Sequence, residues 1–189
     1  MIKKLAKKLK TPKQVQNYLN TFTYNEFDTL RSAAVVSRSK TTHCLEAAFL
    51  AAAILENHNY PPLVLSFESQ DGIDHVVFVF KNKNNWGAVG FSRERGLRGR
   101  KPVFKSIRAL ALSYYEPYVD DTSQMTAYQL ADLDKSKANW RTSKKNVWKT
   151  EKYLIKIPHK KIKPSRKKYL QLKQRYIEQG PLPLRKNWW

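Results

Sequence analysis

The pattern of apolar and polar residues divides the chain into short segments of different character. The most apolar of them, Cys44 to Asn57, is rich in Ala, Leu and Ile and contains no Gly or Pro. Because apolar residues surround it on nearly all sides, it predicts a central, buried helix. The polar run HNYPP follows, and its prolines end the helix.

Three segments typical of strands come after this helix. Leu63 to Glu68 alternates apolar and polar residues, His75 to Phe80 is β-branched and aromatic, and Trp86 to Phe91 is the expected partner strand. Asp71–Gly72 and the polar run KNKNN supply the two turns. A helix followed by an antiparallel meander predicts an α+β fold, with the buried helix packed on a small antiparallel sheet.

The remaining segments carry weaker signals. Thr11 and Pro12 predict a helix start, because the hydroxyl caps free amides and proline fits the first helical position. Gly180 predicts the end of a helix near the C-terminus. We expect helical turns at 27–34 and 106–115, a basic helix at 164–179, polar or basic loops at 37–42 and 93–101, and a strand at 147–157.

A chain of 189 residues is long enough for one domain with a sizeable core. We expect a single domain over 1–189, made of an N-terminal helical segment at 1–40, a Cys/His core at 41–118 and a basic C-terminal extension at 119–189. No internal repeat interrupts this division.

Charge is the unusual feature of the composition. Thirty-six Lys and Arg stand against 15 Asp and Glu, which gives a net charge of +21. The basic residues gather at the two ends, whereas the segment 44–89 is close to neutral. Such a charge attracts polyanions, including nucleic acid, anionic lipid and acidic proteins, without identifying which of them binds. It equally fits a solvated basic surface.

Several classes of protein are not indicated. No run of about 18 apolar residues predicts a transmembrane segment, and the basic N-terminus lacks the apolar core of a secretory signal. One cysteine permits no intrachain disulfide and no zinc site of Cys/His spacing. Nucleotide-binding glycine motifs are missing as well. We therefore expect a cytoplasmic protein without a cofactor or metal.

Cys44 and His75 are the candidates for chemistry. A thiol at a helix start faces unpaired amides and the positive end of the helix dipole, which favour the thiolate. The same amides suit the oxyanion of a tetrahedral intermediate. His75 begins a strand after a turn, where an imidazole can exchange a proton with the thiol. The alternative is that Cys44 is a small core residue, as free cysteines commonly are.

The order of these elements resembles the core of the transglutaminase-like superfamily, which has the papain-type cysteine fold. The resemblance covers roughly 42–92 and rests on the segments THCLEAAFLAAAIL, NHNYPPLVLSF, DHVVFVF and NWGAVGF. It implies a Cys-His dyad of Cys44 and His75 and a thiol-dependent hydrolase or acyl transferase. The family includes peptidases, deamidases and cross-linking enzymes, so the implied substrate is a protein or peptide.

The third catalytic position departs from the family pattern. An Asp or Asn is expected a few residues after Trp86, but the chain has Val, Gly and Phe there, followed by Ser92. Ser92 is therefore the candidate to accept a hydrogen bond from the ring of His75. Asp74 adjoins His75 but faces the other side of the strand. His43 is expected to cap the helix rather than act as a base.

Two further hypotheses stay open beside the enzymatic one. In the first, the chain is an inactive module of the same fold that binds nucleic acid or another polyanion through its basic surface. Alternatively, the basic segment Met1 to Lys10 attaches to an anionic membrane surface.

Overall fold

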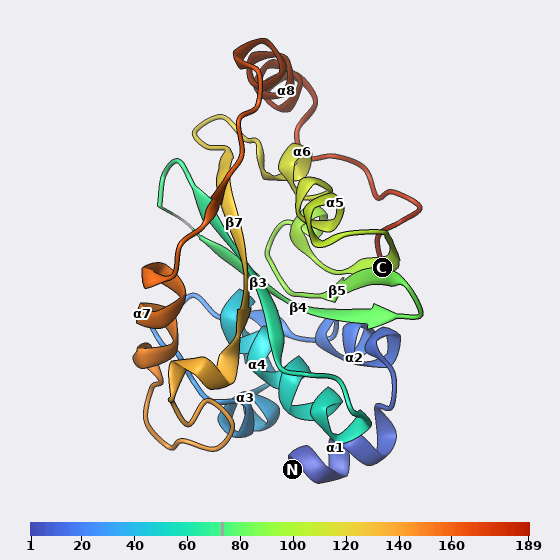
Figure 1. Ribbon diagram of the computed structural model, residues 1–189, viewed down its shortest axis with the longest axis vertical. Helices are drawn as coiled ribbons and strands as arrows, with labels where there is room; N and C mark the ends of the chain where they lie inside the picture. Colours follow the sequence, from blue (N-terminus) through green and yellow to red (C-terminus); the bar gives the residue numbers. More distant parts are fainter. Residues whose placement is uncertain (73) are drawn as a thin grey trace.

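The computed structural model describes residues 1–72 and 74–189. Its centre is a six-stranded sheet in the order β6-β5-β4-β3-β7-β8, in which every neighbouring pair is antiparallel (Figure 1). The strands are β3 (Leu63–Ser69), β4 (His75–Asn82), β5 (Asn85–Val89), β6 (Arg100–Phe104), β7 (Met125–Asp132) and β8 (Lys160–Lys161). Helices pack on this antiparallel sheet, which confirms the predicted α+β class.

Each face of the sheet carries its own apolar cluster. Alternation along β4 sends Phe78 and Phe80 to one cluster and Val77 and Val79 to the other. The first cluster includes residues of α1 (Ile2–Lys8), α2 (Pro12–Leu19), α3 (Ala33–Ser39), α4 (Cys44–Leu55) and α7 (Trp148–Lys156). The second includes residues of α5 (Ile107–Leu112) and α6 (Tyr115–Tyr118). The sheet is therefore the middle layer.

Helix α4 is the centre of the first cluster, as the sequence predicts. Every residue after Cys44 in this helix is buried, and Phe49, Leu50 and Ile54 are fully enclosed. Its small alanines let the neighbouring helices and β4 approach closely. Truncating a side chain such as Phe49 to Ala costs about 3–5 kcal/mol in cores of this kind. The helix start is thus held in place by the best-packed part of the molecule.

A short parallel pair brings the chain to that helix start. Strand β1 (Thr23–Tyr24) pairs with β2 (Thr41–Thr42), and β2 runs into His43 and Cys44. Lys40, before β2, ends α3 in the left-handed conformation with φ of 59°. The predicted polar loop at 37–42 is therefore wrong, because it splits between the end of α3 and β2. The helical turn expected at 27–34 is wrong as well, since α3 begins at Ala33.

The structure also corrects the prediction for 147–157. This segment forms the helix α7 rather than a strand. Its buried residues Thr150 and Leu154 are four positions apart, which puts them on one helical face. The β-branched and aromatic residues around them favoured a strand, but the helical spacing of the buried side chains prevails.

Strands β6 and β7 lie where no strand was expected. Strand β7 pairs with β3 along its whole length, from Leu63 opposite Asp132 to Ser69 opposite Met125. Strand β6 includes Arg100 and Lys101, which were placed in a basic loop. Both owe their conformation to strand pairing rather than to a local pattern, because β7 pairs with the distant strand β3 and β6 with the preceding strand β5.

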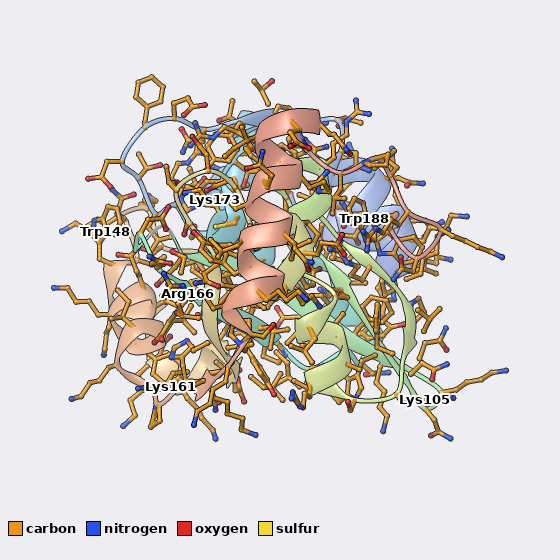
Figure 2. All side chains as sticks on the ribbon, turned by 90° about the horizontal axis from the view of Figure 1, so that it is seen from above. Lys105, Trp148, Lys161, Arg166, Lys173 and Trp188 are labelled. Atoms are coloured by element: carbon orange, nitrogen blue, oxygen red, sulfur yellow. The ribbon has the colours of Figure 1, made fainter. Side chains whose placement is uncertain are left out.

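The C-terminal segment crosses back over the sheet. Helix α8 (Arg166–Gln179) has no buried residue and ends at Gly180 with φ of 70°, as predicted. The tail after it returns to the β5–β6 edge, where Trp188 is 4% exposed (Figure 1). Basic side chains project from several sides of the molecule, among them Lys105 and Lys161 (Figure 2). Within the described residues, no helix is both long and apolar enough to cross a membrane.

Candidate active site

Cys44, His75 and Ser92 line one pocket, although they come from different parts of the fold. Cys44 is half-buried at the first position of α4. His75 opens β4 and is 4% exposed, and Ser92 lies in the loop after β5. The pocket has a volume of about 300 Å³. Its other lining residues are Tyr24, Asp71, Asp74, Arg93, Glu94, Leu97, Tyr118, Asp120 and Ser123.

Two aromatic rings and one backbone carbonyl fix the ring of His75. It stacks on Phe67, with centroids 6.0 Å apart and planes at 10°, and lies 6.3 Å from the ring of Tyr114. Its Nε2 is 2.7 Å from the carbonyl oxygen of Leu97. Because a carbonyl only accepts, Nε2 carries the proton and donates it. In the neutral ring Nδ1 is then the acceptor, which is the form a base requires.

His43 also contacts a backbone carbonyl and the thiol, as His75 does. It is the N-cap residue of α4, but its side chain makes no capping hydrogen bond. Instead its Nε2 lies 2.7 Å from the carbonyl oxygen of Thr29. Burial lowers the pKa of His43, but the hydrogen bond to Cys44 and the charges of Cys44 and Glu46 outweigh burial and raise it. The expected capping role is therefore wrong.

The thiol of Cys44 has the electrostatics of a nucleophile. Burial raises the pKa of Cys44, but the hydrogen bonds with His43 and His75 and the charges of the two rings outweigh burial and lower it to about 5. A thiol with this pKa is a thiolate at neutral pH. The first turn of α4 adds backbone amides that have no partner within the helix. The helix start thus combines an ionised sulfur with donors suited to an oxyanion.

Ser92 does not make the contact that the sequence assigned to it. Its hydroxyl accepts a hydrogen bond from the backbone amide of Glu94 at 3.2 Å, and its carbonyl accepts from Nε of Arg98. The ring N–H of His75 goes to Leu97 instead. The prediction that Ser92 orients the histidine is therefore corrected. The reason is that the loop after β5 turns its backbone, rather than this hydroxyl, toward the ring.

A buried carboxylate organises the segment that holds His43. Glu46 is fully buried, and its Oε2 lies 2.6 Å from Nη2 of Arg31. Its Oε1 accepts from the amide and Nε of Arg31 at 2.8 Å and from the hydroxyl of Thr29 at 3.0 Å. Burial raises the pKa of Glu46, but the hydrogen bonds from Arg31 and the charges of His43 and Arg31 outweigh burial and lower it. The network fixes the Thr29 carbonyl that receives His43.

Sequence reasoning missed two parts of this site. Glu46 was not singled out as a site residue, because nothing in the sequence pairs it with Arg31. Leu97 contributes a backbone oxygen, and a backbone atom leaves no signature in residue type. Only the apposition of the loop after β5 with the start of β4 reveals it.

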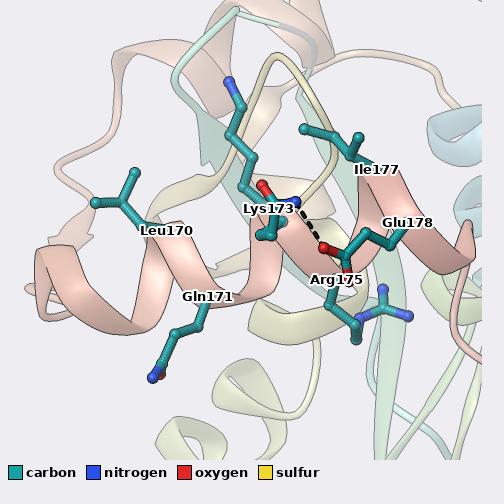
Figure 3. Close-up of a pocket in the computed structure, with 7 residues that line it drawn as sticks. Leu170, Gln171, Lys173, Arg175, Ile177 and Glu178 are labelled. Carbon is teal, nitrogen blue, oxygen red and sulfur yellow. Dashed lines mark hydrogen bonds between the residues drawn. The ribbon is translucent and has the colours of Figure 1, made fainter.

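A hollow of greater volume lies elsewhere and carries no such chemistry. It has a volume of about 580 Å³ and is lined by residues of α8 alone. Leu170, Lys173 and Ile177 project from one side of this helix, and Gln174 donates a hydrogen bond to Glu178 along it (Figure 3). One helix surface without a thiol or imidazole provides no nucleophile. The Cys44 pocket is therefore the candidate active site.

Comparison with known proteins identifies the family. The model of the vasohibin family matches residues 3–178, which is most of the chain. A comparison with curated proteins found no match. Vasohibins have a transglutaminase-like cysteine-protease fold, which agrees with the helix, sheet and Cys44 pocket described above. By the extent of this match, the chain belongs to the vasohibin family.

Proposed function

We propose that the protein is a cysteine-dependent hydrolase or acyl transferase that acts on an amide or ester of a protein or peptide. The observation that carries this proposal is the thiol of Cys44, whose pKa is lowered to about 5 by two imidazoles at the start of a buried helix. Membership in the vasohibin family supports a cysteine-protease-like enzyme in general.

Cys44 is the nucleophile and His75 the general acid and base. The thiolate attacks the carbonyl carbon, and the oxyanion forms close to the amides of the first turn of α4. The imidazolium of His75 gives its proton to the leaving amine or alcohol, and a thioester remains on Cys44. Water or an amine, deprotonated by His75, then attacks the thioester and releases the sulfur.

The carbonyl of Leu97 takes the place of the usual third side chain. It holds Nε2–H of His75 and so keeps Nδ1 available to the thiol. A neutral carbonyl fixes the tautomer but stabilises the imidazolium less than a carboxylate does. The negative charge that a carboxylate would supply comes instead from the thiolate of Cys44, which interacts with both histidines. Ser92 lines the pocket beside this pair as a contact for substrate.

The proposal is tested by trapping the acyl-enzyme. The protein is incubated with 4-nitrophenyl acetate, and the acetyl adducts are located by mass spectrometry; Cys44 is the sole cysteine, so a thioester can form only there. We expect a transient thioester on Cys44, released as nitrophenol turns over, and no such transient adduct in Cys44→Ser. Acylation that is absent, or equally fast in His75→Ala, would contradict the proposal.

The alternative candidate is a module that binds a polyanion without turnover. The exposed α8, with Arg166, Lys167 and Lys168 in its first turn, favours it as a basic surface. Binding to single-stranded RNA and duplex DNA at several salt concentrations tests this candidate, because neutralised phosphates give affinity a steep salt dependence. No binding at low salt excludes nucleic acid as the ligand.

A further inference from the structure

The loop that orients His75 has little regular structure of its own. Leu97 closes a single 3-10 turn, Arg95–Leu97, between β5 and β6. Two internal backbone hydrogen bonds, from the amides of Leu97 and Arg98 to the carbonyls of Glu94 and Arg95, support its position. A carbonyl that must stay 2.7 Å from a catalytic ring needs a stronger restraint than that.

The guanidinium of Arg100 provides it. Arg100 is fully buried, and its Nη2 donates to the carbonyl of Gly96 at 2.6 Å. Its Nη1 donates to the carbonyls of Arg98 and Gly99 at 3.0 and 3.2 Å. Gly96 and Arg98 are the two neighbours of Leu97. One planar group therefore fixes the backbone on both sides of the carbonyl that holds His75.

This guanidinium is charged without a carboxylate partner. Burial lowers the pKa of Arg100 to about 10, so the group still carries its proton at neutral pH. Among the described residues no salt bridge to Arg100 is found. A buried charge is costly unless dipoles surround it. Here carbonyls surround it, and its Nε and Nη2 also donate to the hydroxyl and carbonyl of Ser113.

Two aromatic rings enclose the guanidinium. Its Cζ lies 3.9 Å from the ring centroid of Tyr114 and 4.6 Å from that of Trp188. Tyr114 also donates its hydroxyl to the carbonyl of Arg98 at 3.0 Å and lies beside the ring of His75. The same aromatic side chain thus touches the restraint and the histidine that it orients.

Trp188 reaches this place from the far end of the chain. The tail is bound to the β5–β6 edge by hydrogen bonds from the amide of Lys101 to Asn187 and from the indole of Trp189 to Ala88. A Cβ on Gly96 would lie 2.7 Å from Pro117 and 3.2 Å from the Trp188 ring, so only glycine lets the loop and the indole approach this closely. Trp188, which is labelled in Figure 2, lies outside the residues 3–178 that the family model matches.

We propose that Arg100 is a positioning residue of the site, and that the C-terminal tail completes it by closing Trp188 over the guanidinium. The pair holds the Leu97 carbonyl against His75 and thereby sets the tautomer of the ring that faces Cys44. This inference rests on the proposed function for its catalytic meaning. A purely structural Arg100 would alter stability alone, so the test requires a readout that stability does not move.

The variants are Trp188→Ala, Trp188→Leu, Trp188→Phe and Arg100→Lys. Leucine keeps apolar cover and serves if the alanine variant fails to fold, phenylalanine restores an aromatic face, and lysine keeps the charge but holds fewer carbonyls. Trp86→Ala is the matched control, because Trp86 lies on the neighbouring strand β5 and is not a residue of the pocket. Circular dichroism confirms the fold of each variant.

Two measurements are made on the full chain. Long-range ¹H–¹⁵N spectra report the tautomer of the His75 ring, and the rate of Cys44 alkylation by iodoacetamide between pH 4 and 9 reports the thiol pKa. In the wild type, at a pH where the ring of His75 is neutral, we expect the Nε2–H tautomer. In Trp188→Ala and Arg100→Lys we expect mixed tautomers and a thiol pKa higher by about two units, which lowers alkylation at pH 6 about tenfold.

The control and the conservative variant decide the outcome. Trp188→Phe and Trp86→Ala are expected within about twofold of the wild type at every pH. A folded Trp188→Leu and Arg100→Lys with the wild-type tautomer and pH profile would overturn the proposal. An ordinary thiol pKa in the wild type would instead refute the proposed function. If the tautomer of His75 is nevertheless fixed in the wild type and lost in the variants, the positioning role remains intact.

Discussion

Helices α4 and α8 differ in burial and in the setting of their charged side chains. In α4 every residue after Cys44 is buried and the one acid, Glu46, is enclosed by donors, whereas α8 has no buried residue and carries basic side chains into solvent. The net charge of +21 therefore describes the periphery, not the place where chemistry is expected. Thus a strongly basic composition and a thiol site are separable properties of one fold.

The largest effect is expected from His75→Ala. Without this ring the thiol loses one of the two imidazoles that lower its pKa and also its only proposed proton donor to the leaving group. We expect acylation by 4-nitrophenyl acetate to fall about 10²–10⁴-fold, measured as initial rates at pH 7. Residual activity near the wild-type level would show that another group serves as the base.

Glu46→Ala is expected to cost about 3–5 kcal/mol of stability, because it leaves the guanidinium of Arg31 without its buried partner. Glu178→Ala on the exposed helix α8 is the matched control and is expected within about 0.5 kcal/mol of the wild type. Urea unfolding at pH 7 measures both. Equal costs at the two positions would remove the contrast between the helices.

The same carboxylate predicts an acid limit. The pKa of Glu46 is lowered in the folded protein, so its contribution to stability is present above the unfolded value of about 4.3. That contribution is lost as pH falls through the folded pKa, where the buried group becomes protonated. Between pH 6 and 3 the free energy of unfolding should therefore fall less steeply with pH for Glu46→Ala than for the wild type. Parallel curves would contradict this account.

His43→Ala separates electrostatics from proton transfer. Its hydrogen bond lowers the pKa of Cys44 as that of His75 does, so the thiol pKa is expected to rise in both variants. Acylation at pH 9, where the thiol ionises in either case, should recover in His43→Ala to within about tenfold of the wild type, but not in His75→Ala. Recovery in both would leave no distinct role for His75.

The smallest effects are expected from Ser92→Ala and from charge reversal on α8. The Ser92 hydroxyl bonds the Glu94 amide rather than His75, so acylation should change by no more than about threefold. Lys167→Glu with Lys168→Glu should weaken polyanion binding and reduce its salt dependence while the thiol pKa stays unchanged. A loss of thiolate in the α8 variant would show that the two regions are coupled.

The sequence predicts the local elements of the site but not its long-range ones. The α4 helix and the starts of β3, β4 and β5 follow from composition and alternation, because each is determined by neighbouring residues. Strand β7 depends on pairing with β3, some sixty positions away, and α7 on which face of 147–157 the fold buries. Neither is encoded in a local pattern.

The same distinction applies within the active site. Cys44 and His75 are found from residue type and position, since a thiol at a helix start and an imidazole at a strand start have recognisable settings. Ser92 was assigned by its place after Trp86, yet the contact is made by a backbone oxygen of Leu97. That the Leu97 carbonyl replaces the Ser92 hydroxyl is seen only in the folded loop between β5 and β6, which Arg100 and the tail contact.

The most direct test of the account is the titration of the thiol itself. Absorbance at 240 nm, recorded from pH 3 to 9 for the wild type and corrected with Cys44→Ser, follows thiolate formation at the one cysteine. The account predicts a midpoint near pH 5, as set by the two histidines. A midpoint of about 8–9, the range of an ordinary cysteine, would contradict it.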